Sequence, residues 1–122
     1  MATALKIEVN GDISRIEINS LEELNDAVGG YIEFIHFTDV AHAYINEDGK
    51  ALNLPYNELA TYLCNKFKIG LMPTDFISGN MVILGNGDDG EEADIPESLR
   101  LEIYDQMVEF VKKYKTIRIL EI

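Results

Sequence analysis

Residues 5–18 read LKIEVNGDISRIEI, and this segment indicates the structure of the first part of the chain. Apolar residues alternate with polar residues on both sides of Asn10-Gly11. Such an alternation is typical of β-strands, and Asn-Gly favours a type I′ turn because both residues tolerate a positive φ. The pattern therefore predicts a β-hairpin at the start of the chain.

The residues after this hairpin predict a helix. Ser20 precedes Leu-Glu-Glu, so its hydroxyl can accept a hydrogen bond from the amide of Glu23 while the Glu23 side chain reaches back. Apolar residues continue at helical spacing as far as Val28, and Gly29-Gly30 follows. We expect the helix to begin after Ser20 and to end at these glycines.

Two further strands are expected next. Residues 31–37 are apolar at both alternating sets of positions apart from Glu33, which is typical of a strand in the centre of a sheet. Residues 40–45 predict its antiparallel neighbour, and the turn-forming residues 46–49 (NEDG) end that neighbour.

The second half of the chain predicts two helices, with a strand and a loop between them. Pro55 can occupy the first turn of a helix whose apolar stripe reaches Phe67. Residues 80–84 predict a short buried strand, and residues 85–94, rich in glycine and acidic residues, a solvated loop. Pro96 opens the longest helix, whose apolar residues recur at offsets of three and four.

A final strand over residues 116–122 completes the predicted order, which is β-β-α-β-β-α-β-α-β. The hairpins imply a mainly antiparallel sheet covered by about three helices, an α+β fold. No repeat or long linker divides the sequence, so we expect a single domain over residues 1–122.

The composition narrows the kinds of partner. The chain has 122 residues, with 22 acidic against 10 basic ones and a formal charge of -12. This charge repels nucleic-acid phosphates and anionic membranes, so we expect neither as a direct partner. A basic protein partner is allowed, although a large net charge also serves solubility alone.

Cysteine use and the N-terminus favour a reducing, cytoplasmic setting. Cys64 is the only cysteine, which excludes an intrachain disulfide and a cysteine-based zinc site within one chain. The first residues do not resemble a signal peptide, and no apolar run approaches membrane-spanning length. We expect Cys64 to be buried in the core, because it lies in a predicted amphipathic helix without an activating neighbour.

Residues 85–90 (GNGDDG) match the dinucleotide pattern G-x-G-x-x-G without its structural context. The next predicted helix starts only beyond Asp94, and the acidic residues would repel a pyrophosphate. The spacing of a calcium-binding loop is also absent, since Pro96 stands where its last glutamate should be. We therefore expect no cofactor and no metal ion here.

Acidic residues supply the leading candidate for a binding surface. On the last helix, three of them recur at offsets of three and four and can imitate a phosphate backbone toward a basic groove. The alternative is a solvated helix face on which Glu109 pairs with Lys112 or Lys113. The candidate residues are Asp88, Asp89, Glu91, Glu92, Asp94, Glu102, Asp105 and Glu109.

A second hypothesis places a small enzyme or ligand-binding site beside residues 31–37. Glu33 interrupts an apolar strand, and His36 lies three residues further on. A three-residue connection between the strands would set His36 opposite His42, whereas a two-residue connection would place them on opposite faces. We expect His36 and His42 to be ordinary surface or edge residues. A structural role through self-association is a third alternative.

No catalytic motif supports enzyme activity, so we expect a protein that is not an enzyme. The serines lie in none of the serine-hydrolase motifs. Carboxylates are too numerous for any two of them to be singled out as an acid and base pair.

Several short motifs resemble a known family. Residues 28–33 read VGGYIE, residues 46–50 NEDGK, residues 52–55 LNLP and residues 75–85 DFISGNMVILG. In this order they resemble a short domain of unknown function common in bacteriophages, plasmids and integrative elements. The resemblance ends near residue 85. It implies no catalytic residue, and it suggests a mobile element in a prokaryotic cell, where small acidic proteins often bind host defence or replication proteins.

Overall fold

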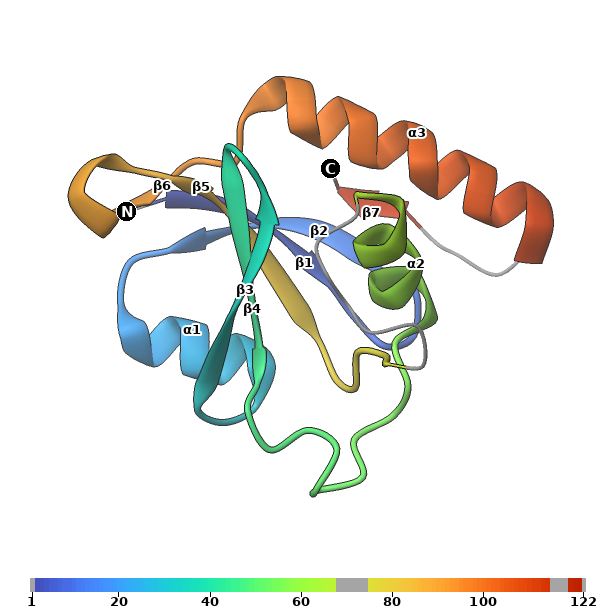
Figure 1. The fold of residues 1–122 in the computed structure, drawn as a ribbon, viewed down its shortest axis with the longest axis horizontal. Coiled ribbons are helices and arrows are strands. Elements are labelled where there is room, and N and C mark those ends of the chain that lie inside the picture. The colour runs from blue at the N-terminus through green and yellow to red at the C-terminus, as the bar shows by residue number, and fades with distance from the viewer. Residues whose placement is uncertain (1, 68–74, 115–118, 122) are drawn as a thin grey trace.

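A mainly antiparallel sheet with helices on both faces organises the α+β fold (Figure 1). The computed structural model describes residues 2–67, 75–114 and 119–121. The strands are β1 (Ala2–Ile7), β2 (Ile13–Ile18), β3 (Ile32–Thr38), β4 (Ala41–Asn46), β5 (Met81–Asn86), β6 (Glu92–Ala93) and β7 (Ile119–Glu121). The helices are α1 (Leu21–Val28), α2 (Glu58–Lys66) and α3 (Glu97–Tyr114), with a 3-10 turn η1 (Asp88–Gly90).

The strands lie in the order β3-β4-β5-β1-β2-β7, and β6 pairs with β5. Neighbouring strands run antiparallel except β2 and β7, which are parallel. The predicted strand and helix order is confirmed with one addition, β6. Of the predicted last strand, residues 116–118 and 122 lie outside the described residues.

The β1–β2 hairpin is confirmed, but the predicted type I′ turn is wrong. The Glu8 amide donates to the Asp12 carbonyl at 2.9 Å, and the Gly11 amide donates to the Glu8 carbonyl at 3.0 Å. Gly11 has a φ of 92°, whereas Asn10 is not in the positive-φ region. The connection is therefore a three-residue loop with one left-handed glycine. The Asn10 side chain stabilises it by accepting a bond from the Asp12 amide at 3.0 Å.

Helix α1 begins and ends where the sequence predicts. The Ser20 hydroxyl accepts a bond from the Glu23 amide at 3.2 Å, and the Glu23 carboxylate accepts one from the Asn19 amide at 2.9 Å. Gly29 ends the helix with a φ of 79° and donates to two carbonyls of the last turn. Because glycine meets no Cβ penalty there, this left-handed cap explains the Gly29-Gly30 pair.

Strand β3 lies at the edge of the sheet, so the prediction of a central strand is wrong. It pairs with β4 on one side, and no described strand lies on its other side. Tyr31 is 71% exposed and Phe34 59% exposed. An apolar run predicts burial by composition alone, whereas here the exposed aromatic residues lie at a sheet edge.

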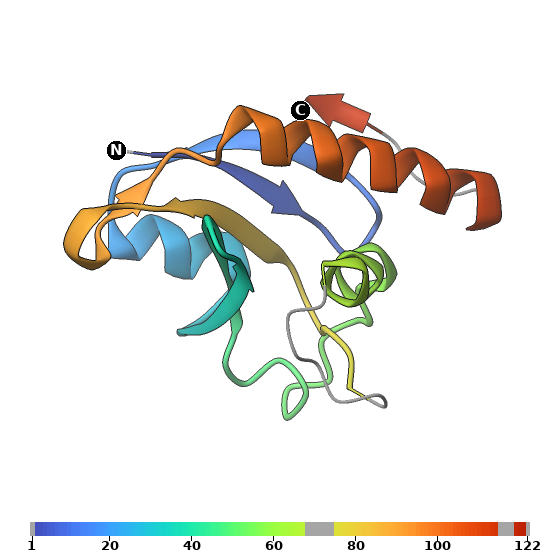
Figure 2. The ribbon, with the colours of Figure 1, turned by 45° about the horizontal axis from the view of Figure 1, so that its top comes forward.

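Strand β5 is a central strand, and its side chains divide between two apolar layers. Met81 and Ile83 pack with α2 and α3, whereas Val82 and Leu84 pack with α1. We call these two sides of the sheet the α2–α3 face and the α1 face; Figure 2 shows α1 and α3 on opposite sides of the sheet. Since both faces are covered, β5 is apolar throughout its buried length.

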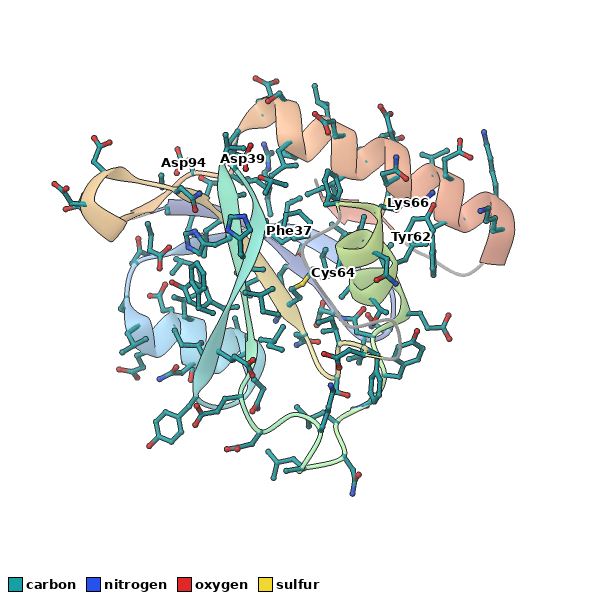
Figure 3. All side chains as sticks on the ribbon, viewed as in Figure 1. Phe37, Asp39, Tyr62, Cys64, Lys66 and Asp94 are labelled. Atoms are coloured by element: carbon teal, nitrogen blue, oxygen red, sulfur yellow. The ribbon has the colours of Figure 1, made fainter. Side chains whose placement is uncertain are left out.

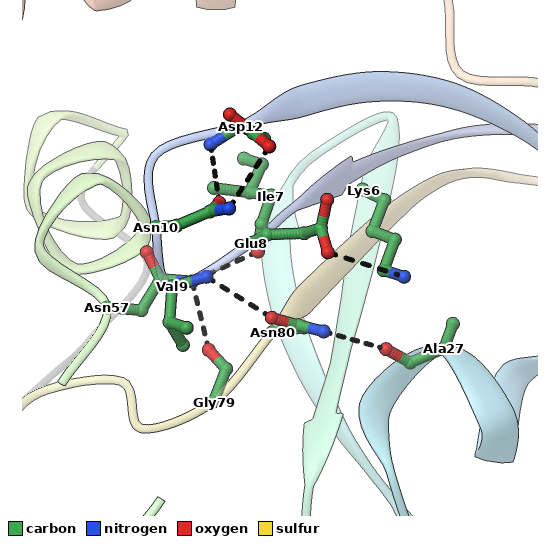
Figure 4. A network of polar contacts seen from close by, with 10 residues as sticks. All are labelled: Lys6, Ile7, Glu8, Val9, Asn10, Asp12, Ala27, Asn57, Gly79 and Asn80. Atoms are coloured by element: carbon green, nitrogen blue, oxygen red, sulfur yellow. Dashed lines mark hydrogen bonds and ion pairs between the residues drawn. The ribbon is translucent and has the colours of Figure 1, made fainter. Parts of the chain in front are cut away.

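Helices α2 and α3 supply the apolar stripes that the sequence predicts. Asn57 caps α2, so Pro55 lies before the helix and not in its first turn. The side chain of Asn57 is buried and makes three bonds: it accepts from the Ala60 amide at 3.0 Å and donates to the carbonyls of Ile7 and Gly79 at 3.0 and 2.9 Å. Figure 4 shows how it joins α2 to the end of β1 and the start of β5.

The segment 85–94 is a β-hairpin, so the prediction of a solvated loop is wrong for its ends. Gly85 and Asn86 belong to β5 and pair with β6. A Cβ on Gly85 would lie 2.1 Å from the Asp94 carbonyl oxygen, so only glycine fits the close approach of the returning chain. None of the described helices is both long and apolar enough to cross a membrane.

Candidate functional site

The predicted acidic residues do not form one surface. Asp88, Asp89 and Glu91 are exposed in the turn between β5 and β6, which we call the acidic turn. Glu102 and Asp105 are exposed on α3 beside the end of α2. Figures 1 and 2 place the acidic turn at one end of the molecule, with α3 extending away from it. In Figure 3 side-chain oxygens are distributed around the whole outline of the molecule.

Three of the predicted residues are engaged within the chain. Asp94 accepts a bond from the Thr3 amide at 2.7 Å, and Glu109 lies 3.5 Å from the Lys112 ammonium. Glu92 bonds to two side chains of β4, described below. The regular stripe that could imitate a phosphate backbone is thus reduced to Glu102 and Asp105, and nucleic-acid mimicry loses its geometric basis.

The bonds of Glu92 centre on His42, which is 5% exposed. His42 Nε2 lies 2.5 Å from Glu92 Oε1, and His42 Nδ1 lies 2.6 Å from Asn86 Oδ1. The Tyr44 hydroxyl donates to Glu92 Oε2 at 2.6 Å. Phe34 stacks on the imidazole, with ring centroids 5.2 Å apart. We call these five residues the His42 cluster.

Both ring nitrogens of His42 face hydrogen-bond acceptors. Asn86 Nδ2 donates to the Asp39 carbonyl at 3.3 Å, so Asn86 Oδ1 is the atom that faces the ring and accepts. Glu92 already accepts from Tyr44 through its other oxygen. When the imidazole carries protons on both nitrogens, it donates through both and forms an ion pair with Glu92.

Tyr44 serves this ion pair as a donor. Burial raises the pKa of the Tyr44 hydroxyl above its usual value, and the hydrogen bond to Glu92 and the negative charge of Glu92 raise it further. The hydroxyl therefore stays protonated at physiological pH. Every polar group of the His42 cluster has a partner inside the chain, so its arrangement anchors β6 to β4 and offers no free base or nucleophile.

His36 and His42 lie opposite each other in the register of β3 and β4, a question that the sequence left open. A bulge between His36 and Thr38 adds the residue that a two-residue connection would lack. His36 is exposed, as expected, but the expectation of a surface or edge residue is wrong for His42. The described part of the chain contains no group of three or more potential metal ligands.

A cleft of about 290 Å³ lies beside Glu33, on the α2–α3 face of β3. Ile35 and Ile45 line it together with Glu33, Glu47 and the segment from Asp75 to Ser78. His36 is not among the residues that line it. The pocket proposed near Glu33 and His36 therefore exists beside Glu33 only, and Glu33 is exposed.

An ion pair at the mouth of the cleft joins Lys50 to Asp75. The hydrogen bond from Lys50 holds the pKa of the Asp75 carboxyl below its usual value, with a smaller contribution from the Phe76 amide. The Lys50 ammonium lies 4.8 Å from the centroid of the Phe76 ring. Three carboxylates and one ammonium among the described lining residues leave two negative charges uncompensated, those of Glu33 and Glu47.

Cys64 is buried against the sheet, as predicted (Figure 3). Its sulfur lies 3.9 Å from that of Met81, and burial raises the pKa of the thiol to about 12. The sequence did not reveal the His42 cluster, because Glu92 lies 50 positions from His42. The only signal in the sequence is His42 itself, a polar residue among the mostly apolar residues 40–45.

Comparison with known proteins agrees with the resemblance seen in the sequence. No curated protein and no solved structure matches the chain. A family model matches residues 1–109, which extends beyond the short motifs and includes most of α3. The chain therefore belongs to the family described as Domain of unknown function (DUF3846).

Proposed function

We propose that this protein is a non-enzymatic binding protein that uses the acidic turn to bind a basic protein. The observation that carries the proposal is that Asp88, Asp89 and Glu91 are all exposed in one turn of a hairpin that the His42 cluster fixes to the sheet. A fixed turn loses little conformational freedom on binding, so more of the interaction energy appears as affinity.

The net charge of -12 favours this function kinetically. A negative protein attracts a basic partner over a Debye length, which raises the association rate and makes it sensitive to salt. Glu102 and Asp105 add to this long-range field without contacting the partner that binds the acidic turn.

The proposed setting is the cytoplasm of a prokaryotic cell that carries a bacteriophage, plasmid or integrative element. The single, buried cysteine suits a reducing compartment. The partner is a protein of the host or of the element itself, with a basic surface and no requirement for nucleic acid.

A charge-reversal experiment tests this proposal. The tagged protein is used to capture proteins from host lysate at low ionic strength, and each candidate is purified and titrated directly. Replacing Asp88 and Glu91 by lysine should abolish binding, whereas replacing Glu22 and Asp26 on α1 by lysine changes the net charge equally and should preserve most of it. Equal losses in the two variants would show nonspecific attraction and contradict the proposal.

The cleft beside Glu33 favours a second candidate function, the binding of a small cationic ligand. Two uncompensated carboxylates and an apolar floor suit an amine that carries a short hydrocarbon. A thermal-shift titration with spermine tests it. Stabilisation that is lost in Glu33→Gln supports this function, and no stabilisation of the unmodified protein contradicts it.

A further inference from the structure

The outer edge of β3 presents backbone groups that no described strand pairs. Residues of an antiparallel pair alternate between those bonded to the neighbouring strand and those whose backbone groups point away from it. The Glu47 amide donates to the Tyr31 carbonyl at 2.9 Å, which makes Tyr31 and Glu47 a bonded pair. By alternation, the amide and carbonyl groups of Ile32, Phe34 and His36 point outward, away from β4.

Strand β4 confirms this assignment independently. The Asn86 amide donates to the Val40 carbonyl at 2.9 Å, so Val40 is bonded to β5. His42 and Tyr44 follow at steps of two and are therefore also bonded to β5. Their register partners in β3 are His36 and Phe34, whose backbone groups consequently find no partner in β4.

The side chains beside this edge differ between the two faces of the sheet. On the α1 face Phe34 is 59% exposed and offers an apolar surface. On the α2–α3 face Glu33 and Glu47 line the cleft, with their charges uncompensated among the described lining residues. Glu33 lies opposite Ile45 in the register. Glu47 follows Ile45 by two residues, so it lies on the same face of the sheet.

We propose that β3 binds an extended segment of a partner protein as an added strand, and that basic and apolar residues alternate in this segment. The outward groups of Ile32, Phe34 and His36 would form the backbone hydrogen bonds. Basic side chains of the segment would lie beside Glu33 and Glu47, and apolar ones beside Phe34. Backbone bonds supply affinity in this mode, and the alternating side chains supply specificity.

Charge excludes a second copy of this chain as the occupant. Two copies would bring together two proteins of formal charge -12 and place their Glu33 carboxylates along one ladder. A charge on an edge strand is a known protection against such self-pairing. The same carboxylate attracts a segment of opposite charge, so the edge discriminates between the two occupants.

The test uses a fluorescein-labelled peptide, Lys-Val-Lys-Val-Lys-Val-Lys, with fluorescence anisotropy at low ionic strength. A block peptide, Lys-Lys-Lys-Lys-Val-Val-Val, has the same composition but cannot place its charges on one face. We expect the alternating peptide to bind more tightly. In Glu33→Lys its affinity should fall about tenfold, because an attraction becomes a repulsion. In the matched control Glu102→Lys the affinity for the alternating peptide should stay within about twofold of that of the unmodified protein.

Amide hydrogen exchange gives a second readout. The peptide should slow exchange at Ile32, Phe34 and His36 and leave Glu33 and Ile35 nearly unchanged, since these two are already bonded to β4. The proposal is overturned if the peptide slows exchange equally at all of these amides or if the block peptide binds as tightly as the alternating one. It is also overturned if Glu33→Lys and Glu102→Lys reduce the affinity equally. The acidic turn plays no part here, so either proposal can fail while the other stands.

Discussion

Removal of the Glu92 carboxylate should destabilise the protein more than removal of the neighbouring carboxylate. Glu92 accepts from His42 at 2.5 Å and from Tyr44 at 2.6 Å. In Glu92→Ala both donors lose their partner, and His42 is 5% exposed. Breaking a fully buried ion pair costs about 3–5 kcal/mol. The Glu92 side chain is 30% exposed, so water replaces part of the loss, and we expect about 2–3 kcal/mol.

The isosteric variant Glu92→Gln should cost less. Its amide can donate to a neutral imidazole while its oxygen accepts from Tyr44, so each bond is kept in uncharged form. Charge-assisted bonds are about twice as strong as neutral ones, so we expect a loss of about 1 kcal/mol. NMR of the ring nitrogens should show both of them hydrogen-bonded in the unmodified protein, and the Nε2 signal should change in Glu92→Gln.

Urea denaturation measures both changes, with Glu91→Ala as the matched control. Glu91 is adjacent and exposed, so its removal should change the free energy of unfolding by less than about 0.5 kcal/mol. The reasoning is refuted if Glu92→Ala costs no more than Glu91→Ala. It is also refuted if the Nε2 signal of His42 is the same in Glu92→Gln as in the unmodified protein.

Three further predictions concern other parts of the fold. Asn57→Ala should lower the free energy of unfolding, measured in urea, by about 3 kcal/mol, because it removes a helix cap and leaves two buried carbonyls without their donor. Asn57→Ser keeps the cap, so its loss should be about 1 kcal/mol smaller. Cys64 should react with a thiol reagent at least about a hundredfold slower in the native protein than in denaturant, and equal rates would contradict its burial. Lys50→Met should raise the pKa of Asp75 toward the usual carboxyl value in an NMR titration. Since the folded pKa of Asp75 is lowered, its contribution to stability is present above the usual value and is lost as pH falls through the folded pKa. In Lys50→Met the folded and unfolded pKa values become nearly equal, so most of this pH-dependent contribution should disappear.

Local patterns predicted the secondary structure well. The Ser20 cap, the Gly29 end of α1 and the stripes of α2 and α3 depend on residues a few positions apart. The turn type was missed because Asn-Gly also suits a three-residue loop, in which only Gly11 needs a positive φ. Sequence periodicity identifies the strands but leaves such local alternatives open.

Long-range relations could not be predicted in the same way. The apolar run at 31–37 has the composition of a central strand, and only the pairing of β4 with β5 places β3 at the edge. The acidic residues of the β5–β6 segment appeared equivalent, yet Glu92 meets His42 across 50 positions while Asp88 remains exposed. The candidate site could therefore be predicted as a cluster of charges, but not as an anchored turn.

The position of β5 between β1 and β4 has a consequence for the order of folding. The β1–β2 and β3–β4 hairpins each join neighbours in the sequence, and in the described sheet they are connected through residues 81–86. Such non-local pairing is slow, because the entropy cost of closing a long loop comes before any stabilising contact forms. During synthesis both hairpins must therefore wait, each with an open edge, until β5 has emerged from the ribosome and joins them.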